Sequence, residues 1–322
     1  MASENLWHTL RNPDGTWQTF FGRIESQVTG GPSAFVAVGC GSIDRQTLQA
    51  VGVGVDGNLW HTLRNADGTW QPSFGLVEGQ VTGGPPSFGA VDCAGTPLGV
   101  QALHVVGVGN DSNLWHTLRN ADGTWQPSFG LIKGQVAGGP SAFVAVGCGS
   151  ADDVVLQVVG VGNDGILWHT LRGPDGTWQR FFGRIESQVT GGPPGFVAVG
   201  CAGDGQALHV VGVANDGNVW HTIRGYDGTW QPSFDQVTGG PGFVAVGCAG
   251  DAQALHVIGV GNDGNLWHTI RNPDGTWQPS FDRIESQVTG GPPGFVAVRC
   301  ANADLTQPST TEPALQVVGV GV

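Results

Sequence analysis

The chain has 322 residues, of which 56 are glycine, 19 are proline and only 12% are charged, and its formal net charge is −13 at pH 7. So much glycine and proline disfavours helices, and we expect an all-β fold. Hydrophobic residues make up 39% of the chain, which is enough to bury a core and excludes a disordered tract. The acidic balance and the single lysine, Lys133, argue against nucleic acid as a partner.

No run of about 18 apolar residues is present, so we expect no membrane insertion. The first residues, MASENLWHTL, lack the basic and apolar regions of a secretory signal peptide. We therefore expect a soluble protein. The sequence leaves open whether it stays in the cytoplasm or is released by a non-classical route.

One sequence unit recurs six times along the chain. Its first tryptophan lies in LWHTLR or a close variant, and successive copies are separated by 53, 55, 53, 52 and 47 residues. Repeats of this length with several short strands are typical of β-propeller blades. We predict a single β-propeller domain over residues 1–322, made of six repeats of about 47–55 residues.

Residues 196–234 illustrate the four antiparallel strands that we expect in each blade. The predicted strands are FVAVGC (196–201), ALHVVGVA (207–214), NVWHTIR (218–224) and TWQPSF (229–234). The Asn-Asp-Gly and Tyr-Asp-Gly tips between them are typical of tight hairpins, because glycine and asparagine tolerate positive φ.

The two ends of the chain complement each other. The chain begins with a third strand, NLWHTLR (5–11), and ends with a second strand, LQVVGVGV (315–322). We predict that these strands pair in one blade and close a ring of six blades. The polar, proline-containing segment 302–313 is predicted to be a surface loop.

Each repeat carries one cysteine at the same place. Equivalent positions on neighbouring blades rarely approach within the roughly 4.4–6.8 Å Cα separation of a disulfide, so we expect buried free thiols. The cysteines are Cys40, Cys93, Cys148, Cys201, Cys248 and Cys300. No CxxC or HxxxH spacing occurs, and we predict no metal and no cofactor. We interpret His104, His209 and His256 as packing residues.

The acidic residues do not indicate catalysis. Each DGTW segment carries an aspartate that we expect to bond its own backbone in a turn. These aspartates are Asp14, Asp67, Asp122, Asp175, Asp227 and Asp274. Glu25, Glu186 and Glu285 have no evident partner in the sequence. Because an active site needs unlike groups and every repeat offers nearly the same set, we expect no enzyme.

The WHTxR strand carries residue types that suit carbohydrate recognition. Strand alternation places Trp7, Thr9 and Arg11 on one face and His8 on the other, so a groove would receive the first three from one blade and histidine from the next. An indole can cover the apolar side of a sugar ring, while guanidinium and imidazole donate to hydroxyls. Alternatively, these side chains fill the core between blades. A multivalent lectin and a structural or protein-interaction scaffold both remain open.

The segment DGNLWHTLRNADGTWQ, with the following GQVTGGP, FVAV and LHVVGVGND, resembles the Photorhabdus-type fucose-binding propeller lectins and, more distantly, the tectonins. The resemblance covers the chain once per repeat. It implies sugar sites between adjacent blades that accept L-fucose and O-methylated sugars without a metal. Fucosylated or O-methylated glycans are therefore the expected partners, and a homo-oligomer is left open. Members of that family have seven blades, whereas this sequence predicts six; its repeats are similar enough to suggest recent duplication or a regularised design.

The motif transfers four candidate ligand-binding residues to each repeat, and the tryptophan of GTWQ as a candidate aromatic wall. The tryptophans and histidines of WHTxR are Trp7, Trp60, Trp115, Trp168, Trp220, Trp267, His8, His61, His116, His169, His221 and His268. The threonines and arginines are Thr9, Thr62, Thr117, Thr170, Thr222, Thr269, Arg11, Arg64, Arg119, Arg172, Arg224 and Arg271. The wall residues are Trp17, Trp70, Trp125, Trp178, Trp230 and Trp277.

Overall fold

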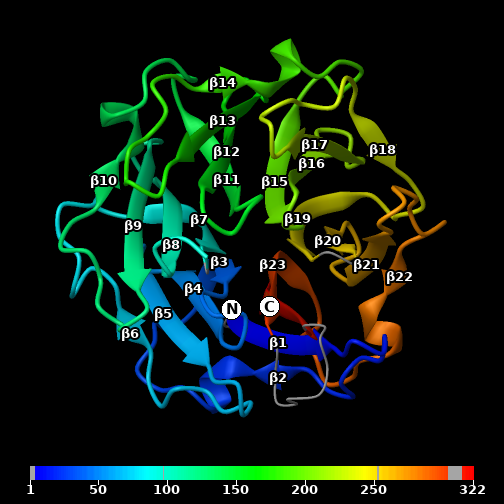
Figure 1. Cartoon of the computed structure of the whole chain (residues 1–322). Helices are drawn as coiled ribbons and strands as arrows, with labels where there is room; N and C mark the ends of the chain where they lie inside the picture. Colours follow the sequence, from blue (N-terminus) through cyan, green and yellow to red (C-terminus); the bar gives the residue numbers. More distant parts are fainter. Residues whose placement is uncertain (1–3, 97, 252–253, 304–313) are drawn as a thin grey trace.

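The computed structural model describes residues 4–96, 98–251, 254–303 and 314–322. Their strands form six four-stranded sheets around a central axis (Figure 1). Every paired strand within a sheet is antiparallel to its neighbour. This confirms the predicted six-bladed β-propeller with four antiparallel strands per blade.

Five blades are built from consecutive strands, named here from the axis outward. Blade I contains β3 (Phe35–Gly41), β4 (Leu48–Gly54), β5 (Leu59–Arg64) and β6 (Gly75–Leu76). Blade II contains β7 (Phe88–Gly95), β8 (Ala102–Gly109), β9 (Leu114–Asn120) and β10 (Gly130–Leu131). Blade III contains β11 (Phe143–Gly149), β12 (Leu156–Gly162), β13 (Leu167–Arg172) and β14 (Gly183–Arg184).

Blade IV contains β15 (Phe196–Gly203), β16 (Ala207–Ala214), β17 (Val219–Gly225) and β18 (Asp235–Val237). Blade V contains β19 (Phe243–Gly250), β20 (Leu255–Gly261), β21 (Leu266–Arg271) and β22 (Asp282–Arg283). The helical turns are η1 (Ile24–Ser26), η2 (Ile132–Gly134), η3 (Ile185–Ser187) and η4 (Ile284–Ser286). None of the helices in the described ranges is long and apolar enough to cross a bilayer.

The sixth sheet, the closing blade, joins both ends of the chain. It contains β23 (Phe295–Ala303), β24 (Ala314–Gly321), β1 (Asn5–Arg11) and β2 (Gly22–Arg23). Strands β24 and β1 pair from Asn5 opposite Gly321 to Arg11 opposite Leu315, which confirms the predicted closure. The prediction of a loop over residues 302–313 was wrong for Asn302 and Ala303, which belong to β23; residues 304–313 lie outside the described residues.

The fourth strand was predicted in the wrong place. In blade IV the predicted strand 229–234 is replaced by β18, which follows it. Trp230 makes only an isolated bridge to Arg224. The next residues turn to the neighbouring blade instead, where the carbonyl of Pro232 accepts the amide of Thr190 at 2.9 Å. These residues therefore form hydrogen bonds to the neighbouring blade and not the expected outer hairpin.

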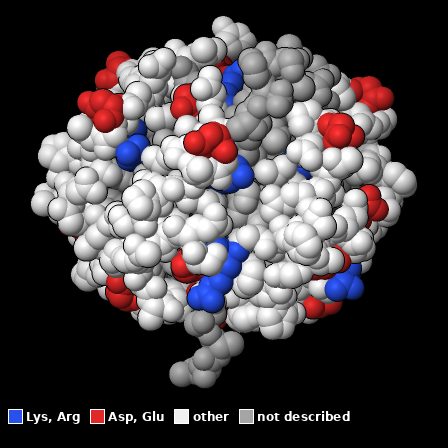
Figure 2. Space-filling model, turned by 90° about the horizontal axis from the view of Figure 1, so that it is seen from below, with Lys and Arg blue, Asp and Glu red and all other residues white. Residues whose placement is uncertain are grey.

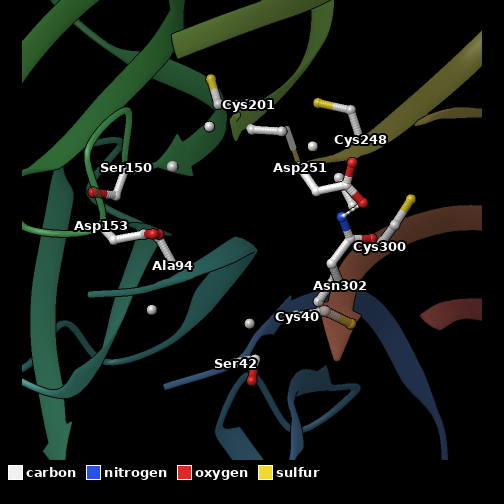
Figure 3. Close-up of a pocket in the computed structure, with 18 of the residues that line it drawn as sticks. Cys40, Ser42, Ala94, Ser150, Asp153, Cys201, Cys248, Asp251, Cys300 and Asn302 are labelled. Atoms are coloured by element: carbon white, nitrogen blue, oxygen red, sulfur yellow. Dashed lines mark hydrogen bonds between the residues drawn. The ribbon is translucent and has the colours of Figure 1, made fainter. Parts of the chain in front are cut away.

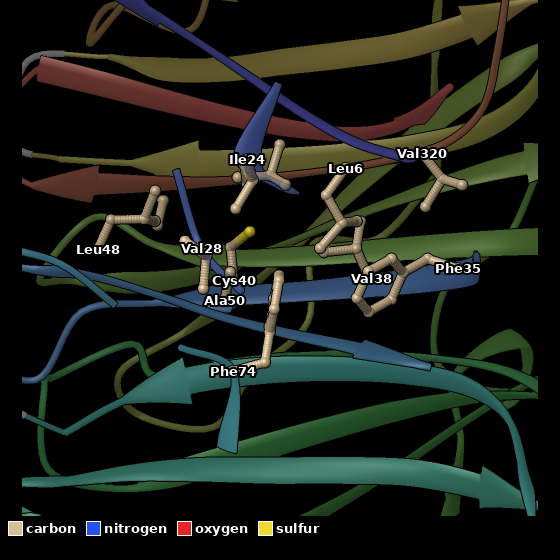
Figure 4. Close-up of a cluster of buried hydrophobic side chains, with 12 residues drawn as sticks. Leu6, Ile24, Val28, Phe35, Val38, Cys40, Leu48, Ala50, Phe74 and Val320 are labelled. Atoms are coloured by element: carbon tan, nitrogen blue, oxygen red, sulfur yellow. The ribbon is translucent and has the colours of Figure 1, made fainter. Parts of the chain in front are cut away.

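The hydrophobic core lies between neighbouring blades. Between the closing blade and blade I, Leu6, Ile24 and Val320 of the first pack with Phe35 and other residues of the second (Figure 4). Gly52 is required here, because a Cβ on it would lie 2.4 Å from the Phe35 ring. Face-to-face packing of blades thus places the third strand of each blade beside its neighbour.

Charged residues are sparse on the outside. Figure 2 shows acidic and basic side chains scattered among uncharged ones, without a continuous basic patch on the face drawn. This face offers no electrostatic track for a phosphate backbone.

Candidate functional site

Each boundary between blades holds an edge-on pair of aromatic rings. His8 of the closing blade lies 5.6 Å from the ring of Trp70 in blade I, with the two planes at 83°. The same pair occurs at all six boundaries, with centroid distances of 5.3–5.6 Å. Histidine therefore comes from one blade and the GTWQ tryptophan from the blade that follows it.

The arginine at the end of the third strand lies beside this pair. Arg64 is half-buried, and its backbone forms an isolated β-bridge to Trp70. Its side chain extends over the turn at Gly68. Burial lowers the pKa of Arg64, and the nearby carboxylate of Asp67 opposes that shift. Within the described ranges, no ion pair joins any of the six WHTxR arginines to a carboxylate. The guanidinium groups thus keep donors for a ligand.

The turn aspartate is occupied locally instead. Asp67 accepts the amide of Thr69 at 2.9 Å and its hydroxyl at 2.6 Å. The equivalent aspartates bond the threonine two residues later in every repeat. This confirms their prediction as turn residues.

The WHTxR tryptophan lies at the other end of the groove. Trp60 precedes Arg64 by four residues, which corresponds to about 13 Å along a strand. Its indole donates to Asp56 of the adjacent turn at 3.2 Å. The structure therefore does not bring the two predicted residues into one contact. Each groove has an arginine end, with the His–Trp pair, and a tryptophan end.

Threonine separates these two ends and is closed off from solvent. Thr62 is fully buried, and its hydroxyl has no hydrogen-bond partner. The same holds at the other five positions, where the exposed fraction is at most 1%. The predicted threonines thus form the base of the groove. Their hydroxyls are covered by other atoms and are not exposed to a ligand in solution.

Sequence reasoning missed a polar residue on the second strand that supports the histidine. Nε2 of His8 donates to Oε1 of Gln316 at 2.8 Å. Glutamine has this place in three blades, as Gln49, Gln157 and Gln316. In two of them the oxygen also accepts Nη1 of an arginine in the following blade, at 3.4 and 3.3 Å.

Histidine takes the same place in the other three blades. Nδ1 of His104 and Nε2 of His116 are joined by a hydrogen bond of 2.9 Å between stacked rings. His209 and His256 make equivalent pairs. These residues are buried or nearly so, as the packing interpretation predicts, and they also orient the WHTxR histidines. The alternation of LQ and LH at the start of the second strand is the sequence signal that could have found this.

The groove histidines are neutral at pH 7. Burial lowers the pKa of His8 to about 3, and the positive charge of Arg64 across the groove acts in the same direction. Burial also lowers the pKa of His61 and His169 to about 3. A neutral ring can hold a tryptophan edge without repelling the arginine beside it.

The three glutamates without an evident partner do have one. Oε1 of Glu25 accepts the amide of Leu6 at 2.7 Å, and Oε2 lies 3.7 Å from Nε of Arg23. Glu186 and Glu285 accept the equivalent leucine amides at 2.8 Å. The prediction was wrong because the partner is a backbone group nineteen residues away, which no side-chain motif reveals.

A pocket of about 520 Å³ opens at one end of the central channel. Figure 3 shows Cys40, Cys201, Cys248 and Cys300 around it, with Asn302 donating to Asp251 at 3.2 Å. All six cysteines are free and buried, which confirms that prediction. Burial raises their thiol pKa, and no cluster of potential metal ligands occurs in the described residues.

An ion pair crosses the channel near these cysteines. Nε of Arg299 lies 3.2 Å from Oδ1 of Asp92, and its Nη atoms donate to the carbonyls of Val146, Val246 and Val298. Asp92 also accepts the amides of Cys93 and Cys148, at 2.9 and 3.0 Å. The sequence signal was the appearance of VDC and VRC where four repeats have VGC.

Comparisons with known proteins find likeness in structure only. No family model and no curated protein sequence matches the chain. AofleA from Arthrobotrys oligospora is 12% identical with a TM-score of 0.61, over 88% of this chain and 79% of that one. SapL1 lectin, solved with alpha methyl fucoside, is 14% identical with a TM-score of 0.57, over 85% and 86%.

The Aleuria aurantia lectin is described as a six-bladed β-propeller with a novel fucose recognition mode. It is 15% identical with a TM-score of 0.53, over 82% of this chain and 84% of that one. At such low identity, likeness establishes architecture and no more. The chain shares the six-bladed β-propeller fold of these proteins.

Proposed function

We propose that the chain is a multivalent carbohydrate-binding protein, not an enzyme, whose grooves bind L-fucose or O-methylated sugars. The observation that carries this is a half-buried arginine without a carboxylate partner in the described residues, placed beside an edge-on His–Trp pair at six boundaries. The fucose and fucoside in the descriptions of SapL1 and the Aleuria aurantia lectin support the sugar. The resemblance to Photorhabdus-type lectins supports the O-methylated ligands.

Each residue at the arginine end has a distinct role in this proposal. Arg64 donates to ring hydroxyls, and Trp70 covers the apolar side of the sugar. His8 is 4% exposed and is tied to Gln316, so it holds Trp70 in place. Trp60, at the tryptophan end, contacts the next sugar residue of a longer glycan.

Affinity at a single groove is expected to be low. A small ligand in a shallow site gains about 4–6 kcal/mol, which corresponds to a Kd on the order of millimolar to tens of micromolar. Six grooves on one ring would engage a glycan-bearing surface together, and avidity could exceed single-site affinity by roughly 10²–10⁴.

Calorimetric titration with L-fucose and methyl α-L-fucoside tests this proposal. We expect a stoichiometry well above one that falls by about one in Arg64→Ala, since its donors are local to one groove. Arg180→Ala is the matched control, because Arg180 is exposed, lies 5.1 Å from the Phe181 ring and belongs to neither the WHTxR nor the GTWQ motif.

Two outcomes would contradict the proposal. A correctly folded protein that gives no heat and no signal on a glycan array is a structural or protein-interaction scaffold. An unchanged stoichiometry in Arg64→Ala would move the binding site away from the arginine end.

A further inference from the structure

A second kind of pocket lies on blade III, where Ile166 directly precedes β13 and Arg184 pairs with Trp168. It has a volume of about 270 Å³ and is lined by Ile166, Arg184, Glu186, Val189, Pro193 and Pro194, together with adjacent residues. None of its described lining residues belongs to a WHTxR motif. Its lining also contains neither Arg172 nor Trp178, so the pocket is distinct from the arginine end of the groove.

Two other blades have an arginine at the position of Arg184, and in both its side chain is held by a neighbouring asparagine. In the closing blade, Nη2 of Arg23 donates to Oδ1 of Asn5 at 2.9 Å, and Nε lies 3.7 Å from Glu25. In blade V, Arg283 makes the same contacts to Asn265 at 2.8 Å and to Glu285 at 3.7 Å. The arginine is thus held by an asparagine before the third strand.

Blade III lacks that asparagine. Ile166 stands at its position and offers no acceptor. Arg184 is exposed, and neither an ion pair with Glu186 within 4 Å nor another side-chain hydrogen bond of Arg184 occurs in the described part of the chain. One substitution has therefore exchanged an internal hydrogen bond for an apolar wall beside a guanidinium group.

Glu186 supplies an acceptor on the same pocket. Its Oε1 accepts the amide of Leu167 at 2.8 Å, whereas its Oε2 is buried without a partner. Burial raises the pKa of Glu186, while the Leu167 amide and the charge of Arg184 oppose that shift. An unpartnered buried oxygen is costly, and a donor brought by a ligand would remove that cost.

We propose that this pocket binds one neutral, hydroxylated ring, such as a single pyranose. One hydroxyl accepts from Arg184 and another donates to Glu186, while the apolar side of the ring lies on Ile166 and Pro193. A carboxylate would meet the charge of Glu186, and an amine would meet that of Arg184, so a neutral ligand with both donors and acceptors fits best. This inference does not depend on binding in the grooves.

The test follows the δ1 methyl signal of Ile166 by NMR in isoleucine-labelled protein, with Ile166→Val assigning the signal. The probes are methyl α-L-fucoside, methyl α-D-mannoside and methyl β-D-glucoside, each added alone. We expect a saturable shift with at least one probe, and an affinity about tenfold lower in both Arg184→Gln and Glu186→Gln.

Asn265→Ile is a further variant, and it should create a second responding methyl group on blade V. Because Trp168 pairs with Arg184, only the indole signals of the GTWQ tryptophans report on the grooves in the same spectra. A shift of indole signals without any shift at Ile166 overturns this inference and leaves the lectin proposal standing. A shift at Ile166 alone supports this inference and contradicts the groove proposal. The inference is also overturned if neither the Ile166 methyl signal nor the indole signals shift, or if the affinity at Ile166 is the same in Arg184→Gln as in the unchanged protein.

Discussion

Between neighbouring blades the repeat is kept almost unchanged, whereas at the channel axis two of its six copies depart from it. All six boundaries carry a WHTxR strand and an edge-on His–Trp pair. At the axis, Asp92 and Arg299 stand where four repeats have glycine. Repetition suits copies of one site, because each groove needs the same groups. A single ion pair suits the axis, because only one pair fits across it.

The comparison also separates two kinds of burial. The grooves bury neutral histidines supported by glutamine or a second histidine. The axis buries a charged pair supported by backbone amides and carbonyls. Acid should therefore act on the two regions in opposite directions.

Acidification is expected to have the largest effect. Eight histidines have a pKa lowered by burial, to about 3 for His8. The unfolded chain binds these protons below about pH 6.5 and the folded chain does not, so the free energy of unfolding falls as pH drops from 6.5 toward 3. Each histidine contributes up to about 1.4 kcal/mol per pH unit. Urea titrations at several pH values measure this.

The axis responds with the opposite sign. Burial raises the pKa of Asp92 to about 6, against the opposing charge of Arg299, so its contribution to stability grows as pH falls through 6.

His104→Gln is the matched control for the grooves, because glutamine occupies that position in three blades. In this variant we expect the free energy of unfolding to fall less steeply with decreasing pH, by the contribution of one histidine. A stability that stays flat between pH 6.5 and 4 would refute the assignment of neutral histidines.

Breaking the axial ion pair is expected to have the next largest effect. Arg299→Gly leaves Asp92 buried and unpaired, and should lower the free energy of unfolding by about 3–5 kcal/mol. The double variant Asp92→Gly, Arg299→Gly has the glycine of the other four repeats and should recover most of that loss. Thermal melting of the two variants measures the difference. Equal destabilisation in both variants would show that Arg299 does not offset the cost of burying the charge of Asp92.

The smallest effect is expected at the groove base. The hydroxyl of Thr62 is fully buried without a partner, so Thr62→Val should keep the shape and raise the free energy of unfolding by about 1 kcal/mol. Urea titration detects such a change. Thr62→Ser, which keeps the hydroxyl and loses a methyl group, is the control and should destabilise. A loss of sugar binding in Thr62→Val would instead make this hydroxyl part of the ligand contact.

The fold was predictable because its determinants are local and repeated. The spacing of WHTxR, the Asp-Gly tips and the complementary strands 5–11 and 315–322 indicate blades, hairpins and closure. The fourth strand was misplaced because its hydrogen bonds go to another blade, as the Thr190 amide shows. Pairing across blades leaves no periodicity in the sequence.

The site was predictable only in part. Alternation along a strand correctly separates His8 from Arg11, but it cannot show that Trp60 and Arg64 lie at opposite ends of a groove. Gln49, Gln157 and Gln316 were missed because the sequence of a strand does not show which residue of the neighbouring strand faces a histidine. The departures at 92 and 299 were visible in the sequence, but only the ring geometry places them across one channel.

The register of the closing blade sets how the ring would respond to a mechanical load. Asn5 lies opposite Gly321 and Arg11 opposite Leu315, so both chain ends leave the β1–β24 ladder at the same edge. A force that pulls residues 5 and 321 apart would act on one residue pair at a time and peel the strands from that edge. Attachment through β5 and β21, in blades I and V, would spread the same force over hydrogen bonds on both sides of the ring. The ring would therefore open at low force when it is held by its two ends.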